Sequence, residues 1–320
     1  MAPSHLGEGW GEGPHIMNNI PCIALVGNAP AEKCELLNTL LDEEGLSEMY
    51  DVALYGADGQ PEMSALSDAL RDYEDGAVDG VVCLPMKKAI ENVMPIRISS
   101  TSRLAAVKRQ TSMAEAANSL TKEEIAECVT KLWKTLKRDL AIQNPRIAIT
   151  SLNNEISTAE DSAEMNVIAP AVSELVKQGI QIFGPIAANK MFEGDGFMAF
   201  DLVVEIYEGQ CDEAFIKATN EETVTLLSGI ETPMTQTEAE GLYTAINLVM
   251  DVERNRKDYD EANANPLQKL YHEKKEDGDK ARFAVKKKGF NPAEHRRENV
   301  TYIKATDQNT PPTEEKTVKE

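Results

Sequence analysis

The sequence predicts an α/β protein with a mostly parallel sheet that helices cover on both faces. Short apolar segments of strand length alternate with longer segments in which apolar residues recur at helical spacing. Strands that alternate with helices in this way form parallel sheets that are buried on both sides. The chain has 320 residues, of which 42% are hydrophobic, and this is enough for two domains with their own cores.

The first third of the chain alternates between expected strands and expected helices. The strands are Cys22–Gly27, Val52–Gly56, Val78–Leu84 and Pro95–Ser99, and the helices are Ala31–Asp42, Pro61–Tyr73 and a short one after Pro85. The leucines of the first helix would share one face, at positions Leu36, Leu37, Leu40 and Leu41.

The clearest helical pattern begins at Thr121. Thr121 and Glu124 form a capping-box signature, and apolar residues follow at spacings of three and four up to Leu140. The later expected elements are the strands Arg146–Ser151, Ile180–Phe183, Asp201–Tyr207 and Thr223–Leu227, and the helices Ser162–Gln178 and Thr237–Glu253. Gly179 is expected to end the first of these helices as its C′ residue.

The two ends of the chain differ from the body between them. Residues 1–16 are rich in glycine and lack an apolar period, so we expect a disordered leader. Residues 17–258 form the body, and residues 259–320 are polar and charged, which predicts a partly disordered tail.

Charge and composition exclude several classes of function. The formal net charge of -21 argues against nucleic acid or an anionic membrane as the main partner. The five cysteines lack zinc or disulfide spacing, and no apolar run approaches the roughly 20 residues of a membrane span. We therefore expect a cytoplasmic protein.

Histidine is missing from the body of the chain. None of the four histidines lies between residues 16 and 271. A Ser-His-Asp triad, a Cys-His pair or a histidine zinc site is therefore excluded there, unless a terminal segment supplies the imidazole.

The strongest functional signal is a set of four segments: Asp79–Lys88, Asn144–Asn153, Gly184–Phe192 and Asp201–Tyr207. Together they resemble the 4-hydroxythreonine-4-phosphate dehydrogenase family of vitamin B6 biosynthesis. The resemblance implies two α/β/α lobes, discontinuous in sequence, with the isocitrate/isopropylmalate dehydrogenase-like fold and a cleft between the lobes. It also implies a homodimer whose cleft oxidises a phosphorylated hydroxy acid with NAD and a divalent metal.

The resemblance places glutamates where the family has its metal-binding histidines. Those three positions fall on Glu155, Glu208 and Glu240. Three carboxylates would favour Mg²⁺ or Mn²⁺ over zinc, because hard cations prefer oxygen ligands. Without a cation, converging carboxylates would repel one another and raise each other's pKa.

The cofactor and substrate segments also depart from the family. The family's glycine-rich loop falls on Gly27–Glu35, where Ala31 and Lys33 replace two glycines. Because each adds a Cβ where backbone could approach a ligand, we expect NAD binding to be weak or absent. The remaining candidate contacts to a small anionic or phosphorylated metabolite are Lys88, Ser100, Thr101 and Lys217.

Two kinds of function stay open. The first is a divergent NAD- and metal-dependent oxidoreductase of pyridoxal phosphate biosynthesis, with the ancestral activity weakened or lost. The second is a non-catalytic dimeric binding or regulatory scaffold with the same fold. The coordinated change from histidine to glutamate favours the first, and the altered glycine loop favours the second.

Overall fold

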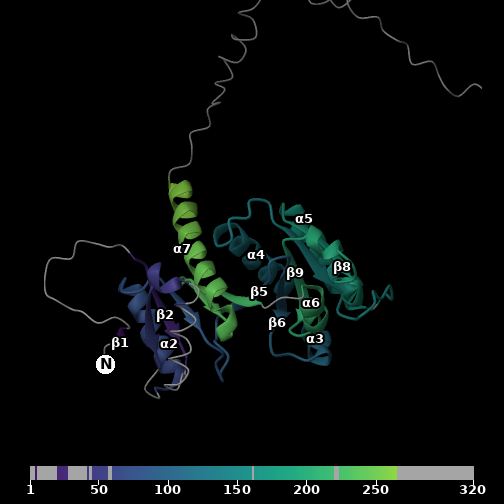
Figure 1. Ribbon diagram of the computed structural model, residues 1–320. Coiled ribbons are helices and arrows are strands. Elements are labelled where there is room, and N and C mark those ends of the chain that lie inside the picture. The colour runs from purple at the N-terminus through teal and green to yellow at the C-terminus, as the bar shows by residue number, and fades with distance from the viewer. Residues whose placement is uncertain are drawn as a thin grey trace, which may run out of the picture. The chain divides into compact units, whose positions relative to one another are not determined.

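An 11-stranded sheet is the frame of the body in the computed structural model (Figure 1). The structure describes residues 4–5, 20–27, 42, 45–56, 60–160, 162–219 and 223–264. In chain order the strands are β1 (Ser4–His5), β2 (Cys22–Val26), β3 (Asp51–Tyr55), β4 (Gly80–Cys83), β5 (Met94–Ile98), β6 (Arg103–Lys108), β7 (Arg146–Thr150), β8 (Gln181–Ile186), β9 (Leu202–Tyr207), β10 (Val224–Ser228) and β11 (Met234–Gln236). Their order across the sheet is β1-β3-β2-β4-β11-β10-β5-β6-β9-β7-β8.

The sheet consists of two parallel blocks joined by antiparallel strands. Strands β3, β2, β4 and β11 form the first block, and β6, β9, β7 and β8 form the second, with parallel pairing inside each. Between them β10 pairs antiparallel with β11 and β5, and β5 pairs antiparallel with β6. These three reversals make the two blocks run in opposite directions. The expected mostly parallel α/β sheet is confirmed.

The described residues contain six complete α-helices: α2 (Glu62–Glu74), α3 (Met113–Ser119), α4 (Lys122–Arg138), α5 (Ala169–Lys177), α6 (Asp212–Thr219) and α7 (Leu242–Ala264). A π-helical turn, Glu164–Ile168, leads into α5, and a 3₁₀ turn, Ala239–Gly241, leads into α7. The capping box of α4 forms as expected, because Thr121 and Glu124 each accept the other's backbone N–H. No helix in the described part of the chain is long and apolar enough to cross a membrane.

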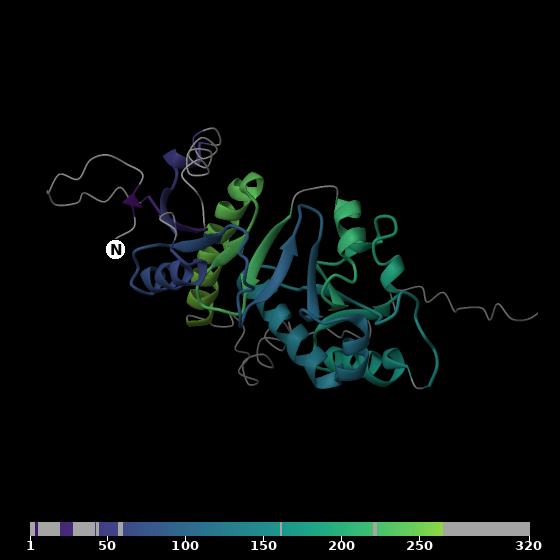
Figure 2. The ribbon, with the colours of Figure 1, turned by 90° about the horizontal axis from the view of Figure 1, so that it is seen from below.

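Alternation along the strands gives the sheet two buried faces, which we call face A and face B. On face A, α7 covers the first block, while α4 and α5 cover the second and lie side by side (Figure 1). The two clusters meet, because Val252 of α7 packs in the cluster formed by α4 and α5. On face B, α2 covers the first block and α6 covers the second. The same elements are seen from below in Figure 2.

A buried ion pair connects α4 and α7 on face A. Arg256 of α7 donates from Nε and Nη2 to the carboxylate of Asp139, at 2.9 and 2.7 Å, and Asp139 is fully buried. Arg138 donates to the same carboxylate at 2.8 Å, and Arg256 also donates to the backbone carbonyl of Glu231. The helices that cover the two blocks are therefore joined at a charged contact as well as an apolar one.

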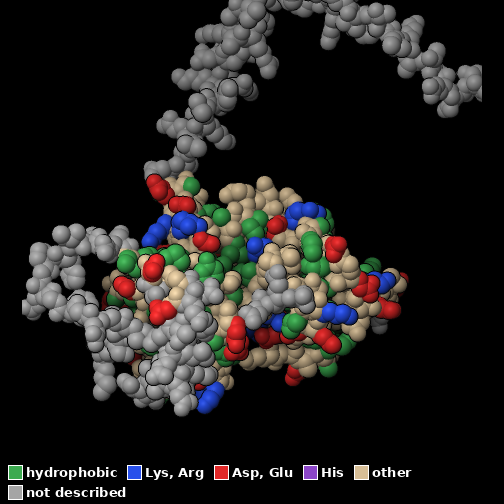
Figure 3. Space-filling model, viewed as in Figure 1, with side chains coloured by type: hydrophobic (Ala, Val, Ile, Leu, Met, Phe, Trp, Pro, Cys, Tyr) green, Lys and Arg blue, Asp and Glu red, His purple; other side chains and the backbone are tan. Residues whose placement is uncertain are grey.

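Charged side chains are interspersed on the side of the body shown in Figure 3. Carboxylates lie between basic side chains there, and the strong net negative charge of the chain does not gather into one patch on that side.

Several sequence-based expectations differ from the structure. The short helix expected after Pro85 is wrong, since residues 85–93 form turns and irregular backbone. The expected end of the last helix at Glu253 is also wrong, because α7 continues to Ala264, beyond the expected end of the body at 258. Ser4–His5, expected in a disordered leader, pair antiparallel with β3. The expected helix Ala31–Asp42 lies outside the described residues except at Asp42, and residues 265–320 of the tail lie outside them altogether.

Candidate functional site

A cavity of about 520 Å³ opens on face B over the strands that join the two blocks. Its floor is made by side chains of the central strands, among them Pro95, Arg97, Leu104, Ala106, Thr225 and Leu227. The neighbours of these residues along the strands, Ile96, Ala105 and Leu226, face the core on face A. Face B is covered by α2 on one side and by α6 on the other, so the central strands between them carry the cavity.

The connection from β4 to β5 forms part of the wall. Strands β4 and β5 run in the same direction, so the chain must cross the sheet between the end of β4 and the start of β5. It crosses on face B, where Met86–Ile90 and Val93 line the cavity. Arg109, which follows β6, donates from Nη1 to the backbone carbonyls of Ile90 and Val93, at 3.3 and 3.0 Å. This contact fixes the connection against the second block and takes carbonyl groups that a helix would have used.

Arg97 is a cationic side chain of the cavity that a charged partner holds in place. Its Nη2 donates to Asp212, the first residue of α6, and its guanidinium lies 5.7 Å from the ring centroid of Phe215. Burial lowers the pKa of Arg97, and the carboxylates of Glu205 and Glu208 act in the opposite direction. Arginine stays protonated through such shifts, so the cavity holds a permanent positive charge.

Glu205 is a carboxylate inside an otherwise apolar strand. It is only 2% exposed, and it points to face B as Val203 does. Its two oxygens accept the backbone N–H groups of Gly209 and Cys211, at 3.1 and 2.7 Å, which closes the turn after β9. Burial raises the pKa of Glu205, and those two donors together with Arg97 partly offset the rise. The buried carboxylate therefore holds both the turn and the charge of Arg97.

The lining of the cavity is mixed in charge. Its basic members are Lys87, Lys88, Arg97 and Arg109, and its acidic members are Glu205, Glu208 and Asp212. Glu208 accepts the backbone N–H of Gln110 at 3.0 Å, which links the ends of β9 and β6. An excess of cations in the cavity of a protein with a net charge of -21 favours a small anionic ligand over a cationic one.

Two of the residues expected from the sequence, Lys88 and Glu208, line the cavity. Ser100 and Thr101 lie instead in the turn between β5 and β6, where the Thr101 hydroxyl is 3.5 Å from that of Ser99. Lys217 is an exposed residue of α6. These three do not line the cavity, so the structure brings together only part of the expected anion-binding set.

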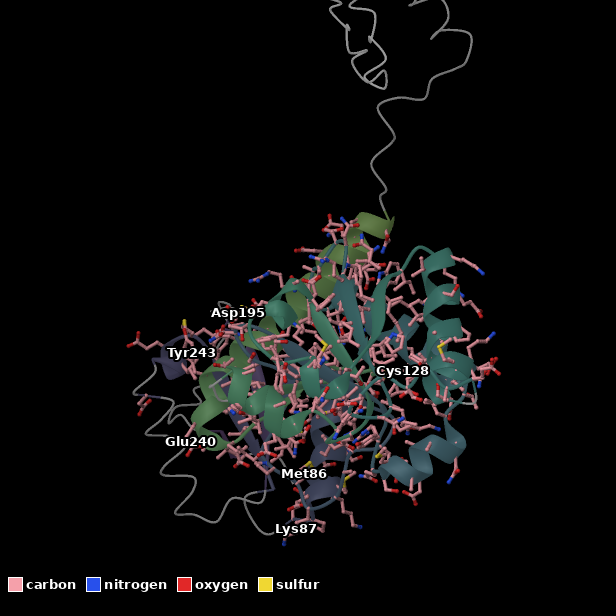
Figure 4. All side chains as sticks on the ribbon, turned by 90° about the vertical axis from the view of Figure 1, so that its right-hand side faces the viewer. Met86, Lys87, Cys128, Asp195, Glu240 and Tyr243 are labelled. Atoms are coloured by element: carbon pink, nitrogen blue, oxygen red, sulfur yellow. The ribbon has the colours of Figure 1, made fainter. Side chains whose placement is uncertain are left out.

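The three glutamates expected to bind a metal are not brought together within one chain. Glu155 and Glu240 are exposed and outside the cavity lining, whereas Glu208 lies at its rim. Among the residues that the structure describes, no group of three or more His, Cys, Asp or Glu side chains could hold a metal ion. In the view of Figure 4, Glu240 and Tyr243 lie on the left, and Met86 and Lys87 lie lower and nearer the middle.

Strand direction explains this separation. Glu155 follows β7 and Glu208 follows β9, which are parallel neighbours in the second block. Glu240 follows β11 of the first block, which runs the opposite way. The carboxyl end of β11 therefore lies at the opposite end of the strands from the carboxyl ends of β7 and β9. The residues present in one chain do not fit a metal held by all three glutamates.

Gln210 is a further residue that the sequence analysis did not single out. Its side-chain nitrogen donates to the carbonyls of Ser151 and Leu152, at 2.7 and 3.0 Å, and its side-chain oxygen accepts from Ile206 and Thr150. It thus joins the ends of β7 and β9. A polar residue just past the end of an expected strand was the available signal, and the same signal marks Glu208 two residues earlier.

A mostly parallel sheet covered on both faces, with a charged cavity over the strands that join its blocks, defines a protein of the α/β class. The model of the family described as "Pyridoxal phosphate biosynthetic protein PdxA" matches residues 91–241. This match, together with relatives named 4-hydroxythreonine-4-phosphate dehydrogenase, confirms the resemblance to that family seen in the sequence.

Individual relatives show how far the likeness extends. A 4-hydroxythreonine-4-phosphate dehydrogenase of Bacteroides thetaiotaomicron is 28% identical over 265 residues, which cover 70% of this chain and 72% of that protein. The protein of the same name from Xanthomonas campestris pv. campestris is 26% identical, and the match covers 53% of this chain and 60% of that protein. A solved 4-hydroxythreonine-4-phosphate dehydrogenase from Burkholderia phymatum shares the fold, with a TM-score of 0.53 at 16% identity, over 75% of this chain and 98% of that one.

Proposed function

We propose that the cavity on face B binds a small anionic or phosphorylated metabolite, and that the NAD- and metal-dependent oxidation of the family is weakened or lost in this chain. The protein would act in the cytoplasm, as its composition suggests, and as a homodimer, as the resemblance to the family implies. The proposal is carried by the contrast between a cavity lined by four basic and three acidic side chains and the separation of the three glutamates expected to bind a metal. The cavity keeps Lys88 and three further cations, whereas Glu155 and Glu240 lie outside it.

The position of the four basic side chains in the cavity favours the binding of an anion. Arg97 and Arg109 lie in a concave site, where fewer water molecules screen their charge than on an open surface. Lys87 and Lys88 are exposed at the rim and can move toward a ligand. Phosphate and carboxylate groups are the usual partners of such a set, because arginine offers a planar fork of donors and lysine a mobile point charge.

The oxidation step has weaker support. A metal bound to a family enzyme of this kind would polarise the substrate hydroxyl, but the three glutamates cannot share one ion inside a single chain. The glycine-rich loop that would contact NAD falls mostly outside the described residues, so weak or absent NAD binding stays a prediction. A non-catalytic binding or regulatory scaffold is the alternative, and it is favoured by Asp212, which already neutralises Arg97 inside the cavity.

Thermal-shift titration of the full chain tests the binding part of the proposal. Inorganic phosphate should stabilise the protein in a saturable way, because a ligand that binds only the folded state raises the free energy of unfolding. Lys88→Ala should weaken this effect, whereas Lys217→Ala, which changes an exposed lysine outside the cavity, should leave it intact. Absence of a saturable shift in the wild-type protein would contradict the proposal.

A parallel titration with Mn²⁺ and NAD tests the loss of oxidation. Neither should produce a saturable shift that depends on Glu155, and Glu155→Gln should behave as the wild type does. Tight binding of NAD, or a Mn²⁺ effect abolished by Glu155→Gln, would support the hypothesis that the protein is an active NAD- and metal-dependent oxidoreductase.

A further inference from the structure

The pair formed by Arg97 and Asp212 is unusual for its place. It lies in the cavity proposed to bind an anion, and one of its members is itself an anion. The side chain of Arg97 is 24% exposed and that of Asp212 is 41% exposed, so the pair is neither sealed in the core nor fully in solvent. Within the described residues the side chain of Arg97 makes this one hydrogen bond, and its other guanidinium N–H groups can bind a ligand.

We propose that Asp212 occupies the place of the ligand on Arg97, and that the oxyanion group of the metabolite binds by displacing it. This inference rests on the proposed function, because it assigns the anion-binding residue of the same cavity. Arg97 would be the residue that selects the ligand, and Asp212 an internal competitor that keeps the guanidinium neutralised until the ligand arrives.

Arg97 is built to stay in position when Asp212 leaves. It belongs to β5, which is paired on both sides, to β10 and to β6. Its guanidinium lies against the ring of Phe215, which is fully buried and held by Phe192 at a centroid distance of 5.6 Å. The buried carboxylate of Glu205 supplies a second negative charge that does not depend on Asp212. The positive charge therefore stays fixed and aimed into the cavity.

Asp212 is placed so that it can leave. It is the first residue of α6 and follows the turn that contains Gly209, whose φ of +90° lies in the left-handed region. The carboxylate makes no other hydrogen bond within the described part of the chain. Released into water, it would regain its hydration, and a surface-type ion pair offers little to oppose the exchange.

The hydrogen-bond donors of the Arg97 guanidinium indicate the class of ligand. A guanidinium edge that is backed by an aromatic ring and open on its other donors recognises a planar carboxylate or a phosphate by two parallel hydrogen bonds. The ligand is therefore a small metabolite with at least one such oxyanion. Inorganic phosphate and malonate represent the two sources and serve as separate probes.

The test compares three variants of the full chain by titration with each probe. Asp212→Asn should bind the preferred probe about two- to fivefold more tightly than the wild type, since it removes the competing charge. Arg97→Lys should bind it about 10- to 100-fold more weakly, because lysine keeps the charge but loses the fork. Glu213→Gln is the matched control: it removes a charge from the exposed neighbour in the same helical turn and should leave binding unchanged.

Opposite signs at Arg97 and Asp212 separate ligand binding from mere support of the fold, because a purely structural pair would lose affinity in both variants. The inference is overturned if Asp212→Asn binds no better than Glu213→Gln. It is also overturned if Arg97→Lys binds like the wild type while Lys88→Ala does not, and in that case the proposed function survives. If neither probe binds the wild type or Asp212→Asn, the proposed function fails as well.

Discussion

Replacing Arg256 with methionine should destabilise the protein more than any exposed substitution on the same helix. Arg256 is 6% exposed and Asp139 is fully buried, and two hydrogen bonds join them. Removing the arginine leaves a buried carboxylate whose remaining charged partner is Arg138. Breaking a buried pair on one side costs about 3–5 kcal/mol. For a folded unit of this size, in which 1 kcal/mol shifts the melting temperature by about 2 °C, that corresponds to a fall of about 6–10 °C.

Urea unfolding followed by circular dichroism would measure the change in the free energy of unfolding. Lys257→Met is the matched control, because Lys257 is the next residue, its side chain is 70% exposed, and its pair with Glu253 should be worth less than about 1 kcal/mol. The double variant Asp139→Leu with Arg256→Met should recover much of the loss, since both buried charges are then gone. If Arg256→Met costs no more than Lys257→Met, the two helices do not depend on this contact.

Two further predictions concern packing and pH. Gly80→Ala should cost about 1–3 kcal/mol, because the new Cβ would meet the side chain of Val249 where α7 packs on β4; Gly196→Ala, which meets open space, should change stability by less than about 0.5 kcal/mol, and thermal melts would compare the two. The hydrogen bond from Lys108 is the main reason that the pKa of Glu124 is lowered, so the stability that Glu124 adds is present above its ordinary pKa of about 4.3 and is lost as the pH falls through the lowered value. Glu124→Gln should therefore cost less than about 1 kcal/mol near neutral pH, and the difference from the wild type should vanish in acid unfolding measured at successively lower pH; a difference that grows in acid would contradict the assignment.

The parts of the fold that were predictable from the sequence are those with a long apolar period. The strand Arg146–Ser151 and the helix beginning at Thr121 are recovered almost to the residue. The missed elements are short or lack a clear apolar run. β6 reads Arg-Leu-Ala-Ala-Val-Lys, β11 has three residues, and α6 has eight. Their conformation depends on pairing with strands far away in the chain, such as β9 for β6, which no local pattern contains.

The candidate site was predictable only where the resemblance pointed to the end of a strand. Lys88 and Glu208 line the cavity, and both were chosen by their place in family motifs. Arg97 and Glu205 carried a signal of their own, a charged residue inside an expected strand, but the sequence could not say that the two strands face one cavity. That fact follows from β5 and β9 both flanking β6 in the sheet order.

The carboxylates in and after β9 can be understood together, because they act on the same guanidinium, that of Arg97. By resemblance a metal-binding histidine of the family falls on Glu208, and this exposed carboxylate lies at the rim of the cavity that contains Arg97. Among the described residues Glu208 belongs to no group of three or more side chains that could hold a metal ion. It lies close enough to Arg97 to raise the pKa of that guanidinium. Glu205 and Asp212 act on the same guanidinium from β9 and from α6. A cavity in which an arginine takes the place of a cation would bind an anion without a metal, and the opposite effects expected at Arg97 and Asp212 follow from that exchange.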